Sequence, residues 1–132
     1  MRLTQETDYA LRLIFAFSRL EPGEFLTARQ IADGQSIPYR FLLRVMKKLK
    51  KAGILASRQG VDGGYRLARP RREISLKDVI EAIEGDIHLN RCLKSTNLCN
   101  AGYAPECKVH KTLCLIQENF LQSLKEHNFE NL

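Results

Sequence analysis

All four cysteines of the chain lie between residues 92 and 114, in the pattern Cys92-x6-Cys99-x7-Cys107-x2-His110-x3-Cys114. Thiolates and imidazole are ligands for soft metal centres. The absence of a C-x2-C pair disfavours structural zinc, whose ligands are usually closely spaced. Widely spaced thiols on an irregular loop suit a bulkier iron–sulfur cluster, in which histidine sometimes replaces one cysteine.

The spacing leaves three alternatives open: an iron–sulfur cluster, a zinc ion, and free or redox-active thiols. His110 lies three residues after Cys107, so it can reach the same metal. Cys114 lies beside an apolar stripe, where a cysteine more often packs as a small hydrophobe. We expect a cytoplasmic protein, because no signal peptide and no run of about 18 apolar residues is present, and disulfides are rare in the cytoplasm.

The net charge of +6 is unevenly distributed. Residues 40–72 contain eleven arginines and lysines and one acidic residue, Asp62, so this segment carries +10 and the rest of the chain −4. Such a block can also be a solvated basic face, but its density favours a polyanionic partner. We therefore expect double-stranded DNA as the partner, with no membrane and no small-molecule substrate.

The segment 27–53 predicts two helices joined by a tight connection. Thr27 and Gln30 form a capping box for a short helix that Gly34 ends, and Pro38 opens a second, basic helix. The apolar side of this second helix is predicted to comprise Phe41, Leu42, Val45 and Leu49. A short helix, a tight turn and a longer basic helix are typical of a helix-turn-helix, whose second helix enters the major groove.

A hairpin is predicted directly after these helices, with strands at 54–57 and 65–68 around the glycine-rich turn 60–64. In this position we interpret the hairpin as a wing that brings Arg58 or Gln59 to DNA. The predicted fold class is mainly α: a winged helix-turn-helix with a two-stranded wing and a long C-terminal dimerisation helix.

The flanking segments complete the organisation. Thr4 caps a helix over about 5–20, and Ser75 caps a helix that Gly85 ends. A last helix, about 106–127, carries an apolar stripe suited to pairing with a second copy. The stripe comprises Val109, Leu113, Ile116, Phe120 and Leu124. The expected parts are a DNA-binding domain at 1–85, a cluster-binding loop at 86–105, and a dimerisation helix with a tail at 106–132.

Three features together resemble one family: MRLTQETDYALR at the N-terminus, GVDGGYRLARP in the wing, and three spaced cysteines before a long helix. Over residues 1–128 the chain resembles the IscR/NsrR type of bacterial regulators. The resemblance implies a dimeric winged-helix DNA-binding protein, and many such regulators carry an iron–sulfur cluster.

The resemblance also implies a set of cluster ligands. Cys92, Cys99 and Cys107 match the three cluster cysteines of the family. IscR-like members add a histidine three residues after the third cysteine, where His110 stands. NsrR-like members add an aspartate near the start of the first helix, which reaches the partner's cluster, and Asp8 stands there. Both candidates are present, so the fourth ligand and the cluster type, 2Fe-2S or 4Fe-4S, stay open.

The chain departs from the family in three places. The gaps between its cysteines are longer than the usual five residues, and the usual V-R-G of the wing reads Arg58-Gln59-Gly60, which shifts the arginine by one place. The recognition helix replaces small and acidic base-reading residues with Pro38, Arg40, Leu43 and Arg44, so we expect a different operator. The expected DNA contacts are Arg40, Arg44 and Lys47 in the major groove, Tyr39, Lys48 and Lys51 at the backbone, and Arg58 and Gln59 on the wing.

These inferences predict a homodimeric transcriptional regulator, expected to be a repressor, whose operator binding is controlled by an iron–sulfur cluster. The cluster would sense iron–sulfur status, nitric oxide or redox state. The alternative is a winged-helix regulator that uses its cysteines as a direct thiol redox sensor or as a zinc site. We do not expect an enzyme built on Cys107 and His110, because nothing in the sequence resembles a substrate pocket or an oxyanion site.

Overall fold

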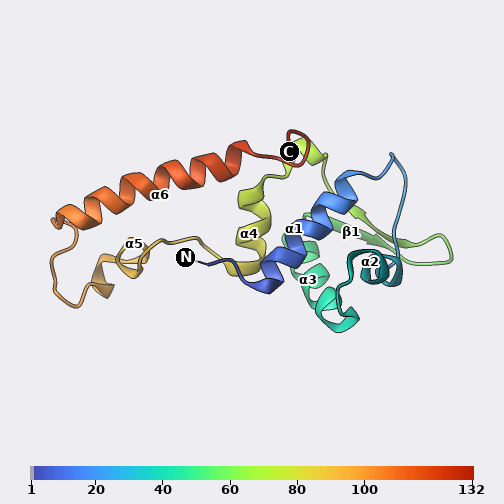
Figure 1. Cartoon of the computed structure of the whole chain (residues 1–132), viewed down its shortest axis with the longest axis horizontal. Helices are drawn as coiled ribbons and strands as arrows, with labels where there is room; N and C mark the ends of the chain where they lie inside the picture. Colours follow the sequence, from blue (N-terminus) through green and yellow to red (C-terminus); the bar gives the residue numbers. More distant parts are fainter. Residues whose placement is uncertain (1) are drawn as a thin grey trace.

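The computed structural model describes residues 2–132 (Figure 1). Over these residues the chain folds mainly as helices, with one two-stranded antiparallel sheet, so the predicted fold class is confirmed. In chain order the elements are α1 (Gln5–Ser18), α2 (Ala28–Gln35), α3 (Tyr39–Lys51), β1 (Leu55–Arg58), β2 (Gly64–Leu67), the 3-10 turn η1 (Arg71–Glu73), α4 (Leu76–Glu84), α5 (Arg91–Lys94), the 3-10 turn η2 (Thr96–Leu98) and α6 (Lys108–Glu126).

Three helix starts follow from side-chain caps that the sequence predicts. The Thr4 hydroxyl caps α1. Thr27 and Gln30 form the predicted capping box at α2, and Ser75 and Asp78 form a second box at α4. Each cap satisfies backbone N–H groups that have no partner inside the helix and contributes about 1 kcal/mol to stability.

Two expectations for the helix-turn-helix are wrong in detail. Gly34 does not end α2, because the helix continues to Gln35 and Ser36 takes the left-handed conformation, with φ 52°. Phe41 does not belong to the buried side of α3, since it is 38% exposed and Met46 is buried instead. Met46 completes the i, i+3, i+4, i+7 spacing of a helix face that packs on a core.

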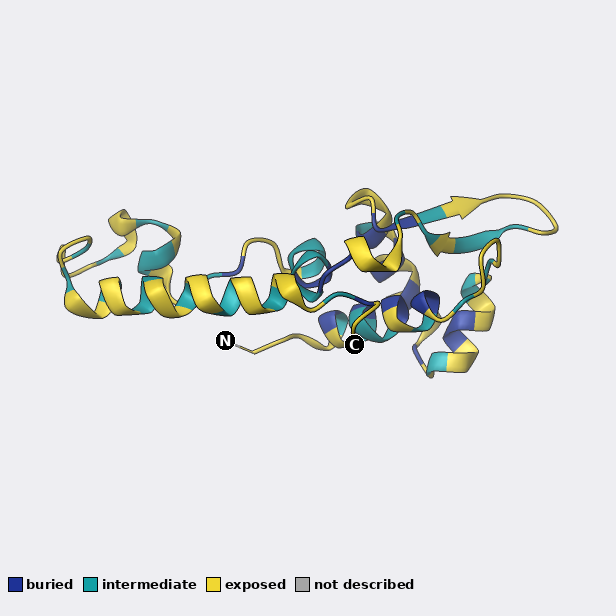
Figure 2. Ribbon diagram, turned by 90° about the horizontal axis from the view of Figure 1, so that it is seen from above, coloured by how far each residue is buried: buried dark blue, intermediate teal, exposed yellow. Residues whose placement is uncertain are grey.

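The core lies between α1, α3 and α4, which pack against one another, and β1 closes one side. Figure 2 shows the buried residues gathered in this winged-helix part, away from α6. The hydrophobic residues exposed by 0% or 1% are Ala10, Leu13, Ile14, Leu42, Val45, Met46, Leu49, Ile54, Ile74 and Val79. Burying one such leucine or isoleucine contributes about 1.5–3 kcal/mol, so this cluster fixes the position of α3.

The last helix extends away from this core and returns to it at its end (Figure 1). None of the described residues of α6 is buried. Beyond the helix, His127 O accepts a hydrogen bond from Leu76 N at 2.9 Å, and Phe129 N donates one to Ile74 O at 3.1 Å. The Phe129 ring is 4% exposed in the winged-helix core, so the end of α6 is fixed to that core. Within residues 2–132, no helix combines the length and the apolar character that crossing a bilayer requires.

Candidate nucleic-acid interface and cysteine pocket

The basic side chains of α3 lie on the side opposite its buried residues. Arg40, Lys47 and Lys51 are exposed. No acidic side chain among residues 2–132 lies within ion-pair distance of these three. Their charges are therefore available to a polyanion, and DNA phosphates are the strongest biological candidates.

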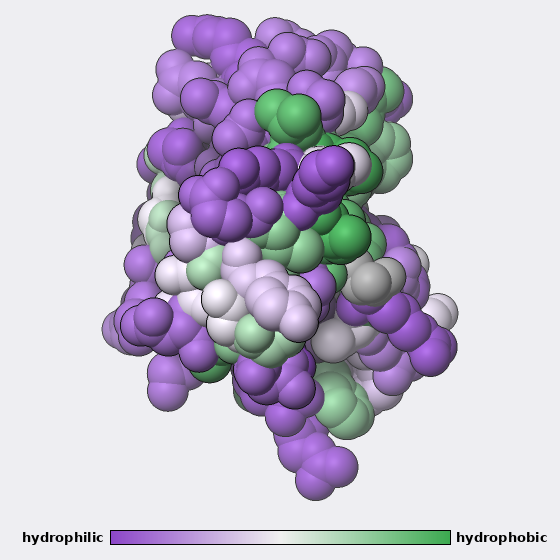
Figure 3. All heavy atoms as spheres, turned by 90° about the vertical axis from the view of Figure 1, so that its left-hand side faces the viewer, coloured by the Kyte–Doolittle hydropathy of each residue, from purple (hydrophilic) through white to green (hydrophobic). Residues whose placement is uncertain are grey.

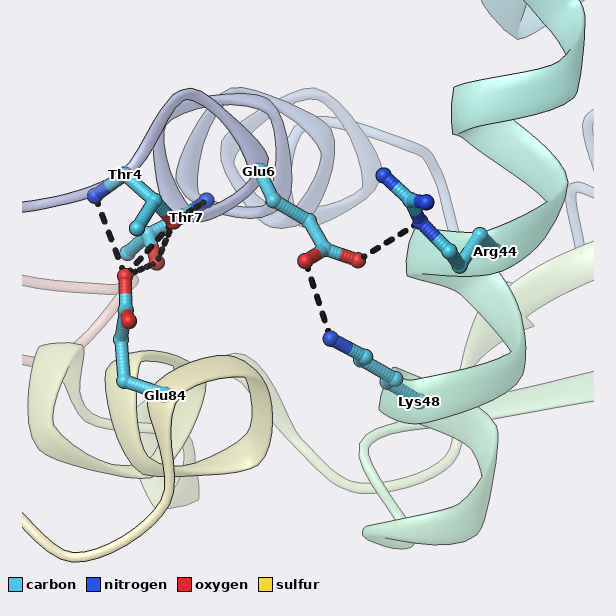
Figure 4. Close-up of polar contacts among 6 residues, drawn as sticks. All are labelled: Thr4, Glu6, Thr7, Arg44, Lys48 and Glu84. Carbon is cyan, nitrogen blue, oxygen red and sulfur yellow. Dashed lines mark hydrogen bonds and ion pairs between the residues drawn. The ribbon is translucent and has the colours of Figure 1, made fainter.

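Arg44 and Lys48, also predicted to meet DNA, both pair with one acid of the same chain (Figure 4). Glu6, in the first turn of α1, places Oε1 3.3 Å from Arg44 Nε and Oε2 2.9 Å from Lys48 Nζ. The Glu6 side chain is 19% exposed. One carboxylate therefore compensates two of the five predicted cations of α3, a feature that the sequence analysis missed.

A second carboxylate ties α1 to α4 (Figure 4). Glu84 Oε1 accepts hydrogen bonds from Thr4 N at 3.0 Å, from Thr4 Oγ1 at 2.7 Å and from the Thr7 hydroxyl. The Thr4 and Thr7 side chains hold the pKa of Glu84 below its usual value, because they stabilise the ionised form. Glu84 ends α4, directly before the segment that leads to the cysteine loop.

At the start of α3, Tyr39 is exposed and lies beneath a cation from α2. The Arg29 guanidinium carbon is 4.7 Å from the centre of the Tyr39 ring, within cation–π range. Arg29 was not predicted as a site residue, because it lies outside the basic block at 40–72. Its place beside Tyr39 adds a positive charge next to the N-terminal end of the recognition helix.

The wing arginines are held by an aromatic ring from the α1–α2 connection. The guanidinium carbons of Arg58 and Arg66 lie 4.0 and 4.9 Å from the centre of the Phe25 ring. Arg58 also donates to the carbonyl oxygen of Asp62 at 2.5 Å. The exposed Gln59 lines a groove of about 400 Å³ between the wing and the start of α2. Arg58 and Gln59 were expected from the sequence, whereas Phe25 has no charge or motif that would mark it.

Two glycines allow close backbone approaches, one within the wing and one between the wing and the segment before α2. A Cβ atom on Gly64, whose φ is +146°, would lie 2.6 Å from Leu26 O, and one on Gly63 would lie 2.3 Å from Arg58 O. Next to Gly64, Tyr65 and Leu26 exchange backbone hydrogen bonds of 2.8 and 3.0 Å. The wing is thus fixed to the segment just before α2, and only glycine fits at these two positions.

The structure brings the predicted cluster ligands of the loop to one cavity. Cys92 from α5, Cys99, Cys107 and His110 from α6 line a cavity of about 240 Å³ together with Tyr103. The three cysteines are reduced and half-buried. The cavity therefore gathers three thiols and an imidazole from both ends of the loop.

Three thiols and an imidazole are donor types that hold iron–sulfur clusters, whose protein ligands bind different iron atoms and can lie apart. Among residues 2–132, no three His, Cys, Asp or Glu side chains lie close enough together to hold one metal ion. The Nδ1 atom of His110 is buried and has no hydrogen-bond partner, and such an unsatisfied nitrogen is suited to bind a metal.

Cys99 has a backbone environment that favours its thiolate. Hydrogen bonding by the backbone of Ala104, and then of Tyr103 and Ala101, lowers the pKa of the Cys99 thiol, while partial burial opposes this shift. Thiolates are both the metal ligands and the nucleophiles among cysteines. The same loop geometry therefore suits a cluster ligand and a reactive thiol.

The remaining predicted ligands and thiols lie outside this geometry. Asp8 is exposed on α1, pairs with Arg12 at 3.3 Å, and does not line the cavity. Cys114 is half-buried rather than buried, and its Sγ lies 3.6 Å from His110 Nε2. Cys114 therefore contacts a candidate ligand from outside the cavity.

A winged helix with a basic recognition helix and a charged wing defines a class of DNA-binding proteins. A family model for Rrf2, described as iron-dependent transcriptional regulators, matches residues 3–132, and the chain belongs to the Rrf2 family. It is 31% identical to the HTH-type transcriptional regulator NsrR of Shouchella clausii (strain KSM-K16), over 100% of this chain and 88% of that protein.

Two solved structures share the fold. IscR of T. potens is similar with a TM-score of 0.75 and 20% identity, over 99% of this chain and 85% of that one. CymR, the global cysteine regulator of B. subtilis, is similar with a TM-score of 0.73 and 17% identity, over 99% of this chain and 95% of that one. The chain is thus a DNA-binding transcriptional regulator of the Rrf2 family and not an enzyme.

Proposed function

We propose that this regulator is a homodimer whose operator binding, as a repressor, is controlled by an iron–sulfur cluster held by Cys92, Cys99 and Cys107. The observation that carries the proposal is the cavity that these thiols share with His110. His110 of the same chain and Asp8 of the partner remain the two candidates for the fourth ligand. When bound, the cluster supplies the chemistry that responds to iron–sulfur supply, nitric oxide or redox state.

The exposed apolar side chains of α6 support the dimer. Val109, Leu115 and Ile116 are 64%, 63% and 50% exposed. Figure 3, which views the molecule from the end that carries the cysteine loop, shows hydrophobic side chains at several places among hydrophilic ones. A long helix with such a face is typical of a subunit interface. Two recognition helices would then read half-sites about 34 Å apart.

Two contacts support a link between the cysteine loop and the DNA-binding part. Leu89 N, before α5, donates to Gln117 Oε1 of α6 at 2.8 Å. At its other end α6 is fixed to the core through Phe129. In the proposed division, residues 1–85 bind DNA, 86–105 hold the cluster and 106–132 form the dimer. An ordered loop would then fix α6, and with it the spacing of the two recognition helices.

The cluster is tested by anaerobic purification with iron and sulfide analysis. We expect a coloured protein containing iron and acid-labile sulfide, loss of both in Cys92→Ser, and retention in Cys114→Ser. Asp8→Ala and His110→Ala then identify the fourth ligand from the change in the absorption spectrum. Colourless protein without sulfide after reconstitution would refute the cluster, and equal operator binding by metal-free and loaded protein would refute the switch.

The DNA surface is tested through the salt dependence of binding. The proposed contacts are Tyr39, Arg40, Arg44, Lys47, Lys48, Lys51, Arg58 and Gln59. Each lost phosphate contact lowers the slope of log K against log salt by about 0.9. Lys51→Ala should therefore reduce the slope by about one unit, whereas Lys111→Ala, at the far end of α6, should not change it. Equal slopes for the two variants would contradict the proposed surface.

A direct thiol sensor is the second candidate, and the lowered pKa of Cys99 favours it. The similarity to CymR, described as a cysteine regulator and also solved in an oxidised form in Staphylococcus aureus, supports the same candidate. Metal-free protein whose DNA affinity changes on mild oxidation, with the change lost in Cys99→Ser, would favour this function over the cluster. A colourless protein that contains zinc would favour the zinc site.

A further inference from the structure

We propose that Glu6 limits the affinity of this regulator for DNA phosphates. Its carboxylate acts as an internal counter-ion that competes with DNA phosphates for Arg44 and Lys48, and so weakens binding to DNA that lacks the operator. The inference rests on the proposed DNA contacts of α3 and adds a residue from α1, outside the DNA-binding surface, to the determinants of affinity.

The geometry shows one acid shared between two cations of the recognition helix (Figure 4). Lys48 Nζ donates to Glu6 Oε2 at 2.9 Å, and Arg44 Nε lies 3.3 Å from Glu6 Oε1. The Arg44 and Lys48 side chains are 58% and 39% exposed, whereas Glu6 is 19% exposed. The cations can thus turn toward a ligand, but the acid cannot turn to solvent as freely.

The pairings of Glu6 with Lys48 and with Arg44 differ in strength, and this decides how readily each cation can exchange Glu6 for a phosphate. The Lys48 contact is a hydrogen bond, but Glu6 Oε1 is buried and accepts no hydrogen bond, so Glu6 holds Arg44 by charge alone. The Arg44 guanidinium carbon also lies 5.0 Å from the centre of the Phe41 ring. Moving both cations to phosphates would leave a largely buried carboxylate without compensation, which is unfavourable. A nonspecific complex gains only phosphate neutralisation in return, so one or both cations stay with Glu6 and their phosphate contacts are not made.

Arg44 is the cation that can leave Glu6 more readily. It lies on the exposed side of α3 and is held without a hydrogen bond to Glu6. An arginine that reaches a guanine forms a bidentate contact, which is stronger than a single phosphate contact and can draw Arg44 away from Glu6.

The test measures binding to a mixed-sequence duplex of about 30 base pairs, three helical turns, across a salt series. Glu6→Gln frees two cations, so its slope should steepen by about 0.9 to 1.8 units, and it should lose about 3- to 12-fold more affinity than wild type between 50 and 200 mM salt. Glu81→Gln is the matched control, because it removes the same charge and breaks a 2.8 Å ion pair with Lys77 on α4. Its slope should equal that of the wild type.

A second comparison needs no change at Glu6. In the wild-type background, Lys48→Gln should lower the slope clearly less than Lys47→Gln does, because Lys48 is already compensated. In the Glu6→Gln background the two substitutions should lower it equally.

The outcomes separate this inference from the proposed interface. If Glu6→Gln has the wild-type slope while Lys47→Gln lowers it, the counter-ion role is wrong and the DNA surface stands. If no substitution on α3 changes the slope, the proposed surface fails. Should Glu6→Gln not fold, equal effects of Lys47→Gln and Lys48→Gln in the wild-type background overturn the inference.

Discussion

Replacing Glu84 by glutamine should lower the free energy of unfolding by about 1 kcal/mol at pH 7. One oxygen of this carboxylate accepts three hydrogen bonds from Thr4 and Thr7. Hydrogen bonds to an ionised group contribute about 1.5–3 kcal/mol and neutral ones about 1 kcal/mol. Glutamine still offers a neutral oxygen as acceptor, so each of the three hydrogen bonds loses only the difference between a charged and a neutral bond. Because Glu84 is exposed, solvent screening reduces the total loss well below the sum of these three differences. For a chain of this size the melting temperature should fall by about 4 °C.

The pH dependence of the stability difference between wild type and Glu84→Gln shows whether the charge or the shape of the Glu84 side chain stabilises the protein. Thr4 and Thr7 lower the pKa of Glu84 in the folded state. Its contribution is therefore complete above the unfolded-state pKa of about 4.3, and it is lost as the pH falls through the lower folded-state value. The difference between wild type and Glu84→Gln should be constant from pH 7 to about 5 and should vanish below the folded-state pKa.

Urea unfolding followed by circular dichroism, under reducing conditions, measures both quantities. Glu81→Gln serves as the control, because it breaks one half-buried i, i+4 ion pair within α4 and should cost about 0.5 kcal/mol or less. A Glu84→Gln protein as stable as the wild type at pH 7, or a difference that persists unchanged at acid pH, would refute the reasoning.

Three further substitutions test other parts of the structure. Gly64→Ala should weaken DNA binding at least tenfold in an electrophoretic shift assay and destabilise the protein, because its Cβ would meet Leu26 O at 2.6 Å. Gly60→Ala, whose Cβ would have no atom within 4 Å, should reduce the DNA affinity less. Ile116→Glu should shift the protein from dimer to monomer in sedimentation analysis, since it charges the exposed apolar face of α6. Phe129→Ala should cost about 3–5 kcal/mol in urea unfolding, because the ring is 4% exposed within the core.

The fold could be predicted where short-range interactions decide it. The capping boxes at Thr27 and Ser75 join residues three positions apart, so the sequence contains the whole interaction. The wing was predicted within one residue at each strand, because its glycine-rich turn lies between two short runs with strand character. The short elements η1, α5 and η2 have no periodicity that would reveal them, and α5 and η2 lie inside the predicted cysteine loop.

The parts that escaped prediction depend on contacts between distant segments. Glu6 meets Lys48 across 42 positions, and Glu84 meets Thr4 across 80. Phe25 is a single aromatic residue in a connection, and only the folded wing brings two arginines to its ring. The spacing of the cysteines identified candidate ligands, whereas their common cavity depends on how α5 and α6 pack around the loop.

The charge block at 40–72 illustrates why composition overstates the attraction to DNA. Counted along the sequence, the eleven cations and one acid of this segment give a net charge of +10. In the folded protein Glu6 joins that block from outside it and compensates Arg44 and Lys48, while Arg40, Lys47 and Lys51 keep their charge exposed. Nonspecific affinity depends on the number of phosphates that a surface neutralises. A cation without an acidic partner therefore adds more to this affinity than a cation that is already compensated. The residues that limit nonspecific affinity therefore lie partly outside the surface that contacts DNA, and a search confined to the basic segment does not find them.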